Sequence, residues 1–87
     1  AYLNEHYTEE LSIEKIAVEI SVSERHLNRS FKEETGMTVM DYLRRYRIQQ
    51  SKILLTQHHL SVAEVAIQVG FSTANHFTRI FRAFKMI

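Results

Sequence analysis

The fold of this chain is decided by a segment that occurs twice, as LSIEKIAVEISVS at residues 11–23 and as LSVAEVAIQVGFS at residues 60–72. The two copies align without a gap. One inserted residue later the match continues, with Leu27 opposite Phe77 and Phe31 opposite Phe81. Self-similarity of this kind indicates one supersecondary unit written twice in the sequence.

Each copy has the outline of a helix, a tight turn and a second helix. Ser12 and Ser61 stand where a helix N-cap is expected, and Glu64 completes a capping box in the second copy. The first helix of each copy is short, about eight residues, because a turn signal follows it. That signal is Gly70 in the second copy, where glycine supplies a positive φ, and Ser21, a weaker substitute, in the first.

The rest of the chain is predicted to be helical as well, which makes the fold all-α. Proline is absent, glycine occurs only at Gly36 and Gly70, and aliphatic residues recur at intervals of three and four, so we expect six helices and no strand. Between the copies, Thr38 is the N-cap of a central helix that continues to about Gln57. Its about 20 residues, at about 1.5 Å each, would span about 30 Å, close to the roughly 34 Å of one DNA turn.

We therefore expect two helix-turn-helix subdomains joined by a long central helix. Their predicted boundaries are residues 1–37 for the first subdomain, 38–57 for the linker helix and 58–87 for the second subdomain.

The second helix of each copy carries a polar stripe at positions i, i+3, i+4 and i+7, opposite an apolar stripe that includes Leu27 in one copy and Phe77 in the other. The two polar stripes are Arg25, Asn28, Arg29 and Lys32, and Asn75, Thr78, Arg79 and Arg82. A single charged stripe is usually a solvated helix face. Two stripes in register favour DNA recognition, because arginine can pair bidentately with guanine and asparagine with adenine in the major groove.

Composition and charge exclude several other classes of protein. The chain has 87 residues, of which 45% are hydrophobic and 24% charged, and a net charge of +1. Residues 1–24 contain six acids and one base, whereas residues 25–87 contain ten bases and four acids. There is no cysteine, no apolar run long enough for a membrane span and no secretion signal, which suits a cytoplasmic location. The five histidines lack metal-ligand spacing, so we expect no metal, no cofactor and no enzymatic activity.

Several separated motifs together give the chain a resemblance to a known family. They are the segment from Ser12 to Gly36, DYLRRYRI at residues 41–48, VA at 65–66, GF at 70–71 and FTRIF at 77–81. In order and spacing they resemble the C-terminal DNA-binding domain of AraC/XylS transcription regulators, over nearly the whole chain. The resemblance implies that two helix-turn-helix units bind adjacent major grooves of promoter DNA.

The resemblance and the two stripes together predict the DNA-contacting residues. The predicted base contacts are Arg25, Asn28, Arg29, Ala74, Asn75, Thr78 and Arg79. Ala74 is too short to hydrogen-bond and would contact a thymine methyl group. Phosphate contacts are expected from basic side chains and from helix N-termini. The residues predicted to make them are Ser23, His26, Lys32, Arg47, Thr73, His76, Arg82 and Lys85. Arg44, Arg45 and Lys52 also lie along the central helix, where a backbone contact and simple solvation both fit.

The chain departs from the family pattern at its end. Met86 stands where glycine is usual, and the closing Ser-Pro-x-x-Tyr-Arg segment is missing after Ile87, so we expect a truncated C-terminal end. The family implies a regulator that recruits or blocks RNA polymerase, more commonly an activator, with its effector-binding and dimerisation domain outside this fragment. The alternative is a helical protein-interaction module without DNA activity. RNA binding is disfavoured because the sequence offers no exposed aromatic platform for unpaired bases.

Overall fold

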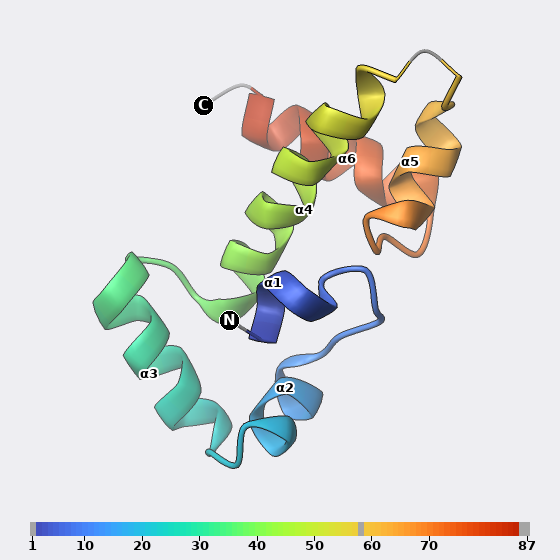
Figure 1. The fold of residues 1–87 in the computed structure, drawn as a ribbon. Helices are drawn as coiled ribbons and strands as arrows, with labels where there is room; N and C mark the ends of the chain where they lie inside the picture. Colours follow the sequence, from blue (N-terminus) through green and yellow to red (C-terminus); the bar gives the residue numbers. More distant parts are fainter. Residues whose placement is uncertain (1, 58, 86–87) are drawn as a thin grey trace.

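The computed structural model describes residues 2–57 and 59–85, the side chain of Lys85 excepted. These residues form six α-helices and no strand, which confirms the all-α prediction (Figure 1). The helices are α1 (Tyr2–His6), α2 (Ile13–Glu19), α3 (Glu24–Thr35), α4 (Val39–Leu55), α5 (Val62–Gln68) and α6 (Ala74–Lys85). The pairs α2–α3 and α5–α6 lie at opposite ends of α4 (Figure 1). Within the described ranges, no helix is long and apolar enough to cross a membrane.

Serine and threonine caps begin the helices where the sequence predicts them. The Ser12 hydroxyl accepts a hydrogen bond from the Lys15 N–H at 3.1 Å, without a reciprocal bond. In the second copy, the Ser61 hydroxyl accepts from the Glu64 N–H at 3.1 Å and the Glu64 carboxylate accepts from the Ser61 N–H at 3.3 Å. This capping box confirms the prediction. Each cap contributes about 1 kcal/mol by pairing N–H groups that the helix leaves free.

The turn of each copy contains one residue with a left-handed backbone. Gly70 has φ 98°, and Ser21, at the matching turn, has φ 61°. Ser21 is the one non-glycine residue with positive φ in the described part of the chain. A side chain in this conformation costs about 1–2 kcal/mol, so the first turn is the strained one of the two.

The core consists of two apolar clusters that α4 connects. The first cluster contains Leu3, Leu11, Ile16, Ala17, Leu27, Val39 and Leu43. The second contains Ile48, Val65, Ala66, Val69, Phe71 and Phe77. Both repeat alanines, Ala17 and Ala66, are buried, one in each cluster, in a close-packed interior that leaves little space for a larger side chain. The side chain of Tyr7 packs against both clusters.

The central helix is shorter than the sequence predicts. It starts after its N-cap Thr38 as expected, but it ends at Leu55 after 17 residues, with Thr56 as C-cap. At about 1.5 Å per residue, α4 spans about 25 Å rather than about 30 Å. The difference arises because the N–H groups of Thr56 and Gln57 bond to carbonyls three residues back and tighten the chain into a turn. His58, which follows, lies outside the described residues.

Candidate nucleic-acid interface

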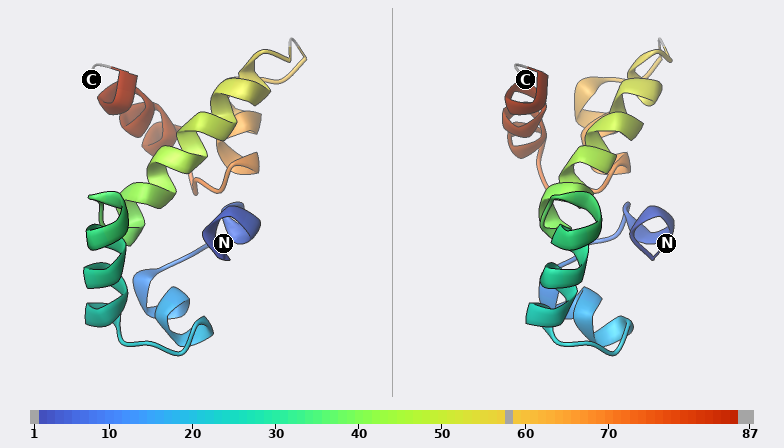
Figure 2. Two further views of the ribbon diagram at one scale, coloured as in Figure 1. Left: turned by 60° about the vertical axis from the view of Figure 1, so that its left-hand side comes forward. Right: turned by 90° about the vertical axis from the view of Figure 1, so that its left-hand side faces the viewer.

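The helices that carry the two polar stripes, α3 and α6, lie toward the same side of the molecule. In both views of Figure 2 they are found to the left, while α1 lies to the right. The two helices belong to the pairs at opposite ends of α4 (Figure 1), in a molecule whose longest dimension is 41 Å. One straight ligand on that side could therefore meet both helices.

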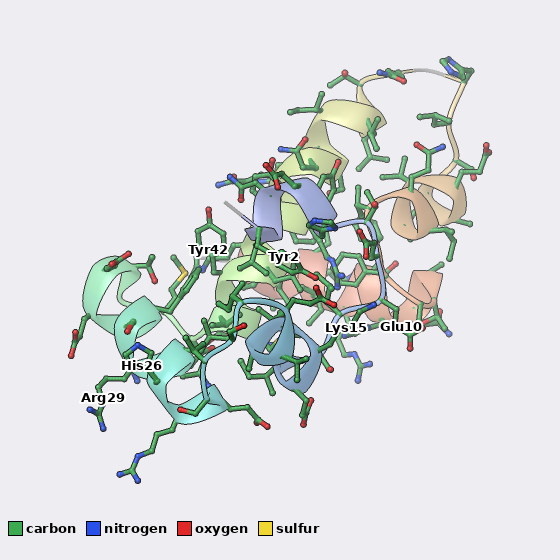
Figure 3. The ribbon with its side chains drawn as sticks, turned by 60° about the horizontal axis from the view of Figure 1, so that its bottom comes forward. Tyr2, Glu10, Lys15, His26, Arg29 and Tyr42 are labelled. Carbon is green, nitrogen blue, oxygen red and sulfur yellow. The ribbon has the colours of Figure 1, made fainter. Side chains whose placement is uncertain are left out.

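On α3, the basic side chains are free for a ligand. Arg25, His26, Arg29 and Lys32 are all exposed, whereas Leu27 is buried in the first core cluster. Figure 3 shows Arg29 extending from α3 away from the rest of the molecule. The helix is thus amphipathic, as the spacing of its residues predicts, and its outer face is charged.

Asn28, unlike the other members of the first stripe, forms a hydrogen bond within the protein and is not fully exposed. Its side chain is half-buried, and its Oδ1 accepts a hydrogen bond from the Val39 N–H at 3.2 Å. This bond satisfies an N–H at the start of α4 and ties α3 to that helix. A bidentate pair with adenine needs both the carbonyl oxygen and the amide nitrogen, so the contact predicted for Asn28 is not available in this arrangement.

On α6, the exposed residues of the stripe are Asn75, Arg79 and Arg82. Ala74 and Thr78 are half-buried; Ala74 packs against the second core cluster, and the Thr78 hydroxyl donates to the Ala74 carbonyl at 2.9 Å. Of the five α6 residues predicted to contact bases or belonging to the stripe, the three exposed ones are polar and the two half-buried ones, Ala74 and Thr78, are small.

The N-termini of α3 and α6 are built alike. The Ser23 hydroxyl accepts from the His26 N–H and the Thr73 hydroxyl accepts from the His76 N–H, each at 3.1 Å. The His76 ring also packs edge-on against Phe71, with centroids 5.3 Å apart, and is half-buried. Both helix N-termini carry the partial positive charge that favours an anion.

Arg47, predicted to contact phosphate, is instead part of the interior. Its side chain is 7% exposed. Its Nε donates to the Tyr7 carbonyl and one Nη donates to the Glu9 carbonyl, both at 2.8 Å. Burial lowers the pKa of this guanidinium, and the positive charge of Arg44 lowers that pKa further. The structure therefore uses Arg47 within the protein, because residues far away in sequence cover its side chain and accept hydrogen bonds from it.

The other basic residues of α4 are engaged at the surface. Arg44 donates to Asp41 at 3.1 Å, and the Arg45 guanidinium lies over the Phe84 ring, 5.0 Å from its centre. Surface contacts of this kind contribute little to stability, so Arg44 and Arg45 can exchange them for contacts with a partner. Lys52 is exposed. The predicted phosphate contact of Lys85 falls on a side chain outside the described part.

Comparisons with known proteins agree with this architecture. A family model described as a helix-turn-helix domain matches residues 16–86. The chain is 38% identical over 82 residues to the HTH-type transcriptional activator RhaS of Klebsiella pneumoniae strain 342, a match that covers 94% of this chain and 30% of the relative. The chain thus spans less than a third of the length of this curated relative.

Two solved structures are also similar. An AraC-type DNA-binding-domain regulator from Chromobacterium violaceum superposes with a TM-score of 0.85 at 30% identity, covering 99% of this chain and 77% of that chain. The DNA-binding domain of the global transcriptional factor AdpA, solved in complex with a target DNA, has a TM-score of 0.88 at 30% identity, covering 94% of this chain and 74% of that one.

Proposed function

Because the chain belongs to the AraC/XylS family of helix-turn-helix transcription regulators, we propose that it binds promoter DNA sequence-specifically, with α3 and α6 in successive major grooves. The observation that carries this proposal is the placement of two exposed basic helices on one side of α4 (Figure 2). The family consists of DNA-binding regulators and is not a family of enzymes.

The two helices would bind different combinations of bases. On α3, Arg25 and Arg29 would each pair with a guanine, since the Asn28 carbonyl is already bonded to Val39. On α6, Asn75 would pair with an adenine and Arg79 with a guanine. The first half-site is therefore expected to be defined by guanines and the second by an adenine and a guanine. Ala74 and Thr78 would make the small contacts beside them, such as one with a thymine methyl group.

The phosphate contacts would come from the rims of the two helices. We assign them to the helix starts at Ser23 and Thr73, each with the histidine that follows it, His26 and His76. The basic side chains assigned to the same role are Lys32, Arg82 and Lys85. These contacts would fix the position of the protein on the duplex but carry no sequence information themselves.

The role of the whole protein is proposed from its relatives. RhaS is a transcriptional activator, and we propose activation for this protein too, with RNA polymerase as its second partner. Since the chain covers only part of such relatives, an effector-binding and dimerisation domain would lie elsewhere in the protein. The site of action would be the cytoplasm. We propose the division into residues 1–37, 38–57 and 58–87 as the two DNA-binding subdomains and their linker.

Selection from a random duplex library, followed by titration of the selected site at several salt concentrations, tests this function. We expect two short conserved blocks about one helical turn apart and an affinity that falls steeply with salt, since each neutralised phosphate adds about −0.9 to the slope of log K against log salt. No enriched sequence and a shallow salt dependence would contradict the proposal. They would favour the helical protein-interaction module instead.

A further inference from the structure

The turn after α1 reaches across to the second half of the molecule. Tyr7 and Glu9 precede the first helix-turn-helix in the sequence, but the Tyr7 carbonyl lies directly against Gly70, in the turn between α5 and α6. A Cβ atom at Gly70 would lie 2.4 Å from that carbonyl oxygen and 2.8 Å from the Arg47 Nε. The two segments therefore touch at a point where only glycine fits, for reasons of space as well as of its φ of 98°.

Arg47 holds this junction together from the middle of α4. Its planar guanidinium spans two backbone carbonyls, those of Tyr7 and Glu9, at 2.8 Å each, and it lies 5.7 Å from the centre of the Phe71 ring. No ion pair joins Arg47 to a carboxylate in the described part of the chain. Burying an unpaired cation is costly, so the carbonyl contacts must offset that cost, and the fork geometry of arginine suits them better than a lysine would.

The relative position of α3 and α6 depends on few connections. In the first unit α2 packs on α3 and α3 packs on α4, whereas in the second unit α5 and α6 pack on each other and both pack on α4. Asn28 ties α3 to the start of α4. The Arg47 junction ties the segment that leads into α2 to α4 and to the turn that leads into α6. It is thus a link between the two units in addition to the helix itself.

We propose that Arg47 is a positioning residue for DNA recognition, which fixes α6 relative to α3 and thereby sets the one spacing between half-sites that the chain binds well. This inference rests on the proposed function. A rigid link concentrates the second helix at one place along the duplex, whereas a loose link must be ordered on binding and accepts several spacings.

The test compares duplexes that differ only in spacing. We would measure the affinity of the purified chain for the selected site, for the same site with one base pair inserted or removed between the blocks, and for each block alone. The variants are Arg47→Met, which removes the donors, and Arg47→Lys, which keeps the charge but not the fork. Lys52→Met is the matched control, because it removes an exposed charge from the same helix. Thermal unfolding and circular dichroism establish that each variant is folded.

For the wild-type chain we expect one inserted base pair to cost about tenfold in affinity or more, and for Arg47→Met less than about threefold, with single-block affinities unchanged within about twofold. Arg47→Lys should fall between them, and Lys52→Met should keep the wild-type spacing preference. If Arg47→Met does not fold, Arg47→Lys and Gly70→Ala, which displaces the Tyr7 carbonyl from the other side, test the same junction.

Two results would overturn the inference. One is a folded junction variant with the wild-type spacing preference, and the other is an equal loss of affinity for every duplex and for single blocks, which is the mark of a general loss of structure. A wild-type chain that binds no sequence selectively would mean that the proposed function itself fails, and the inference with it.

Discussion

At the scale of single residues, the two polar stripes leave equivalent positions free for DNA. Equivalent positions in the repeat hold Asn28 and Thr78, and both are bonded within the protein, Asn28 to Val39 and Thr78 to the carbonyl of Ala74. The flanking arginines, Arg29 and Arg79, are equivalent as well, and both are exposed. Base specificity should therefore depend on the arginines more than on their small polar neighbours.

Replacing Arg29 or Arg79 by alanine should relax the preference at one base position by about 1–3 kcal/mol, because a bidentate contact with guanine discriminates by that amount. The measurement is the affinity for the selected site and for its single-base variants. Lys32→Ala, on the same exposed face of α3, is the control and should weaken all duplexes alike. A uniform loss from both arginine variants would reject the base-contact assignment.

Asn28→Ala should affect stability rather than specificity. It removes the acceptor for the Val39 N–H at the start of α4, which should lower the free energy of unfolding by about 1 kcal/mol and leave base preference unchanged. Asn75→Ala is the contrasting variant, since Asn75 is exposed on α6: stability should hold and preference at one adenine should relax. Denaturant unfolding and single-base variants of the site measure both effects. A specific loss at one base pair from Asn28→Ala would show that its amide binds DNA.

At the scale of the elements, the duplicated turns show how one backbone conformation accepts two different residues. Gly70 has no room for a Cβ, whereas Ser21 tolerates its side chain at the cost of a left-handed backbone. A substitution at the first turn can therefore raise the stability of the protein, whereas one at the second turn cannot.

Ser21→Gly should raise the free energy of unfolding by about 1 kcal/mol, since glycine adopts the left-handed conformation at little cost and the gain exceeds its greater freedom in the unfolded chain. Such a gain corresponds to about 4–8 °C in the melting temperature of a domain of this size. Gly36→Ala, at φ 77° with open space around it, is the control for backbone strain alone and should be destabilising. Gly70→Ala should be the most destabilising of the three. A melting temperature unchanged in Ser21→Gly would refute the strain at this turn.

At the scale of the whole molecule, charge and arrangement act together. The net charge is only +1, and the acids of residues 1–24 lie mostly on α1, α2 and the segment between them. Figure 3 shows Glu10, in that segment, far from Arg29 on the outward face of α3. Affinity should therefore come from local contacts at the two helices, because surface charges farther away than about 8–10 Å are screened in physiological salt.

Arg82→Ala and Lys32→Ala should each reduce the slope of log K against log salt by about one, because each removes one proposed phosphate contact, and the double variant by about two. Lys15→Ala is the matched control and should leave the slope unchanged, because Lys15 is an exposed lysine on α2 near Glu10 (Figure 3). Titration of one duplex across a salt series provides the slopes. Equal slopes for all the variants would contradict the phosphate assignment.

Periodicity, caps and the internal repeat determined the helices, their order, the capping box and the identity of the outward faces, because these signals act over one or two helical turns of the same chain. Only the tertiary structure decided what Asn28 and Arg47 do. Their partners lie 11 residues away for Asn28 and 40 and 38 residues away for Arg47. A polar residue with the spacing of a surface stripe becomes structural when another segment covers it, and packing between distant segments leaves no pattern in the spacing of either one.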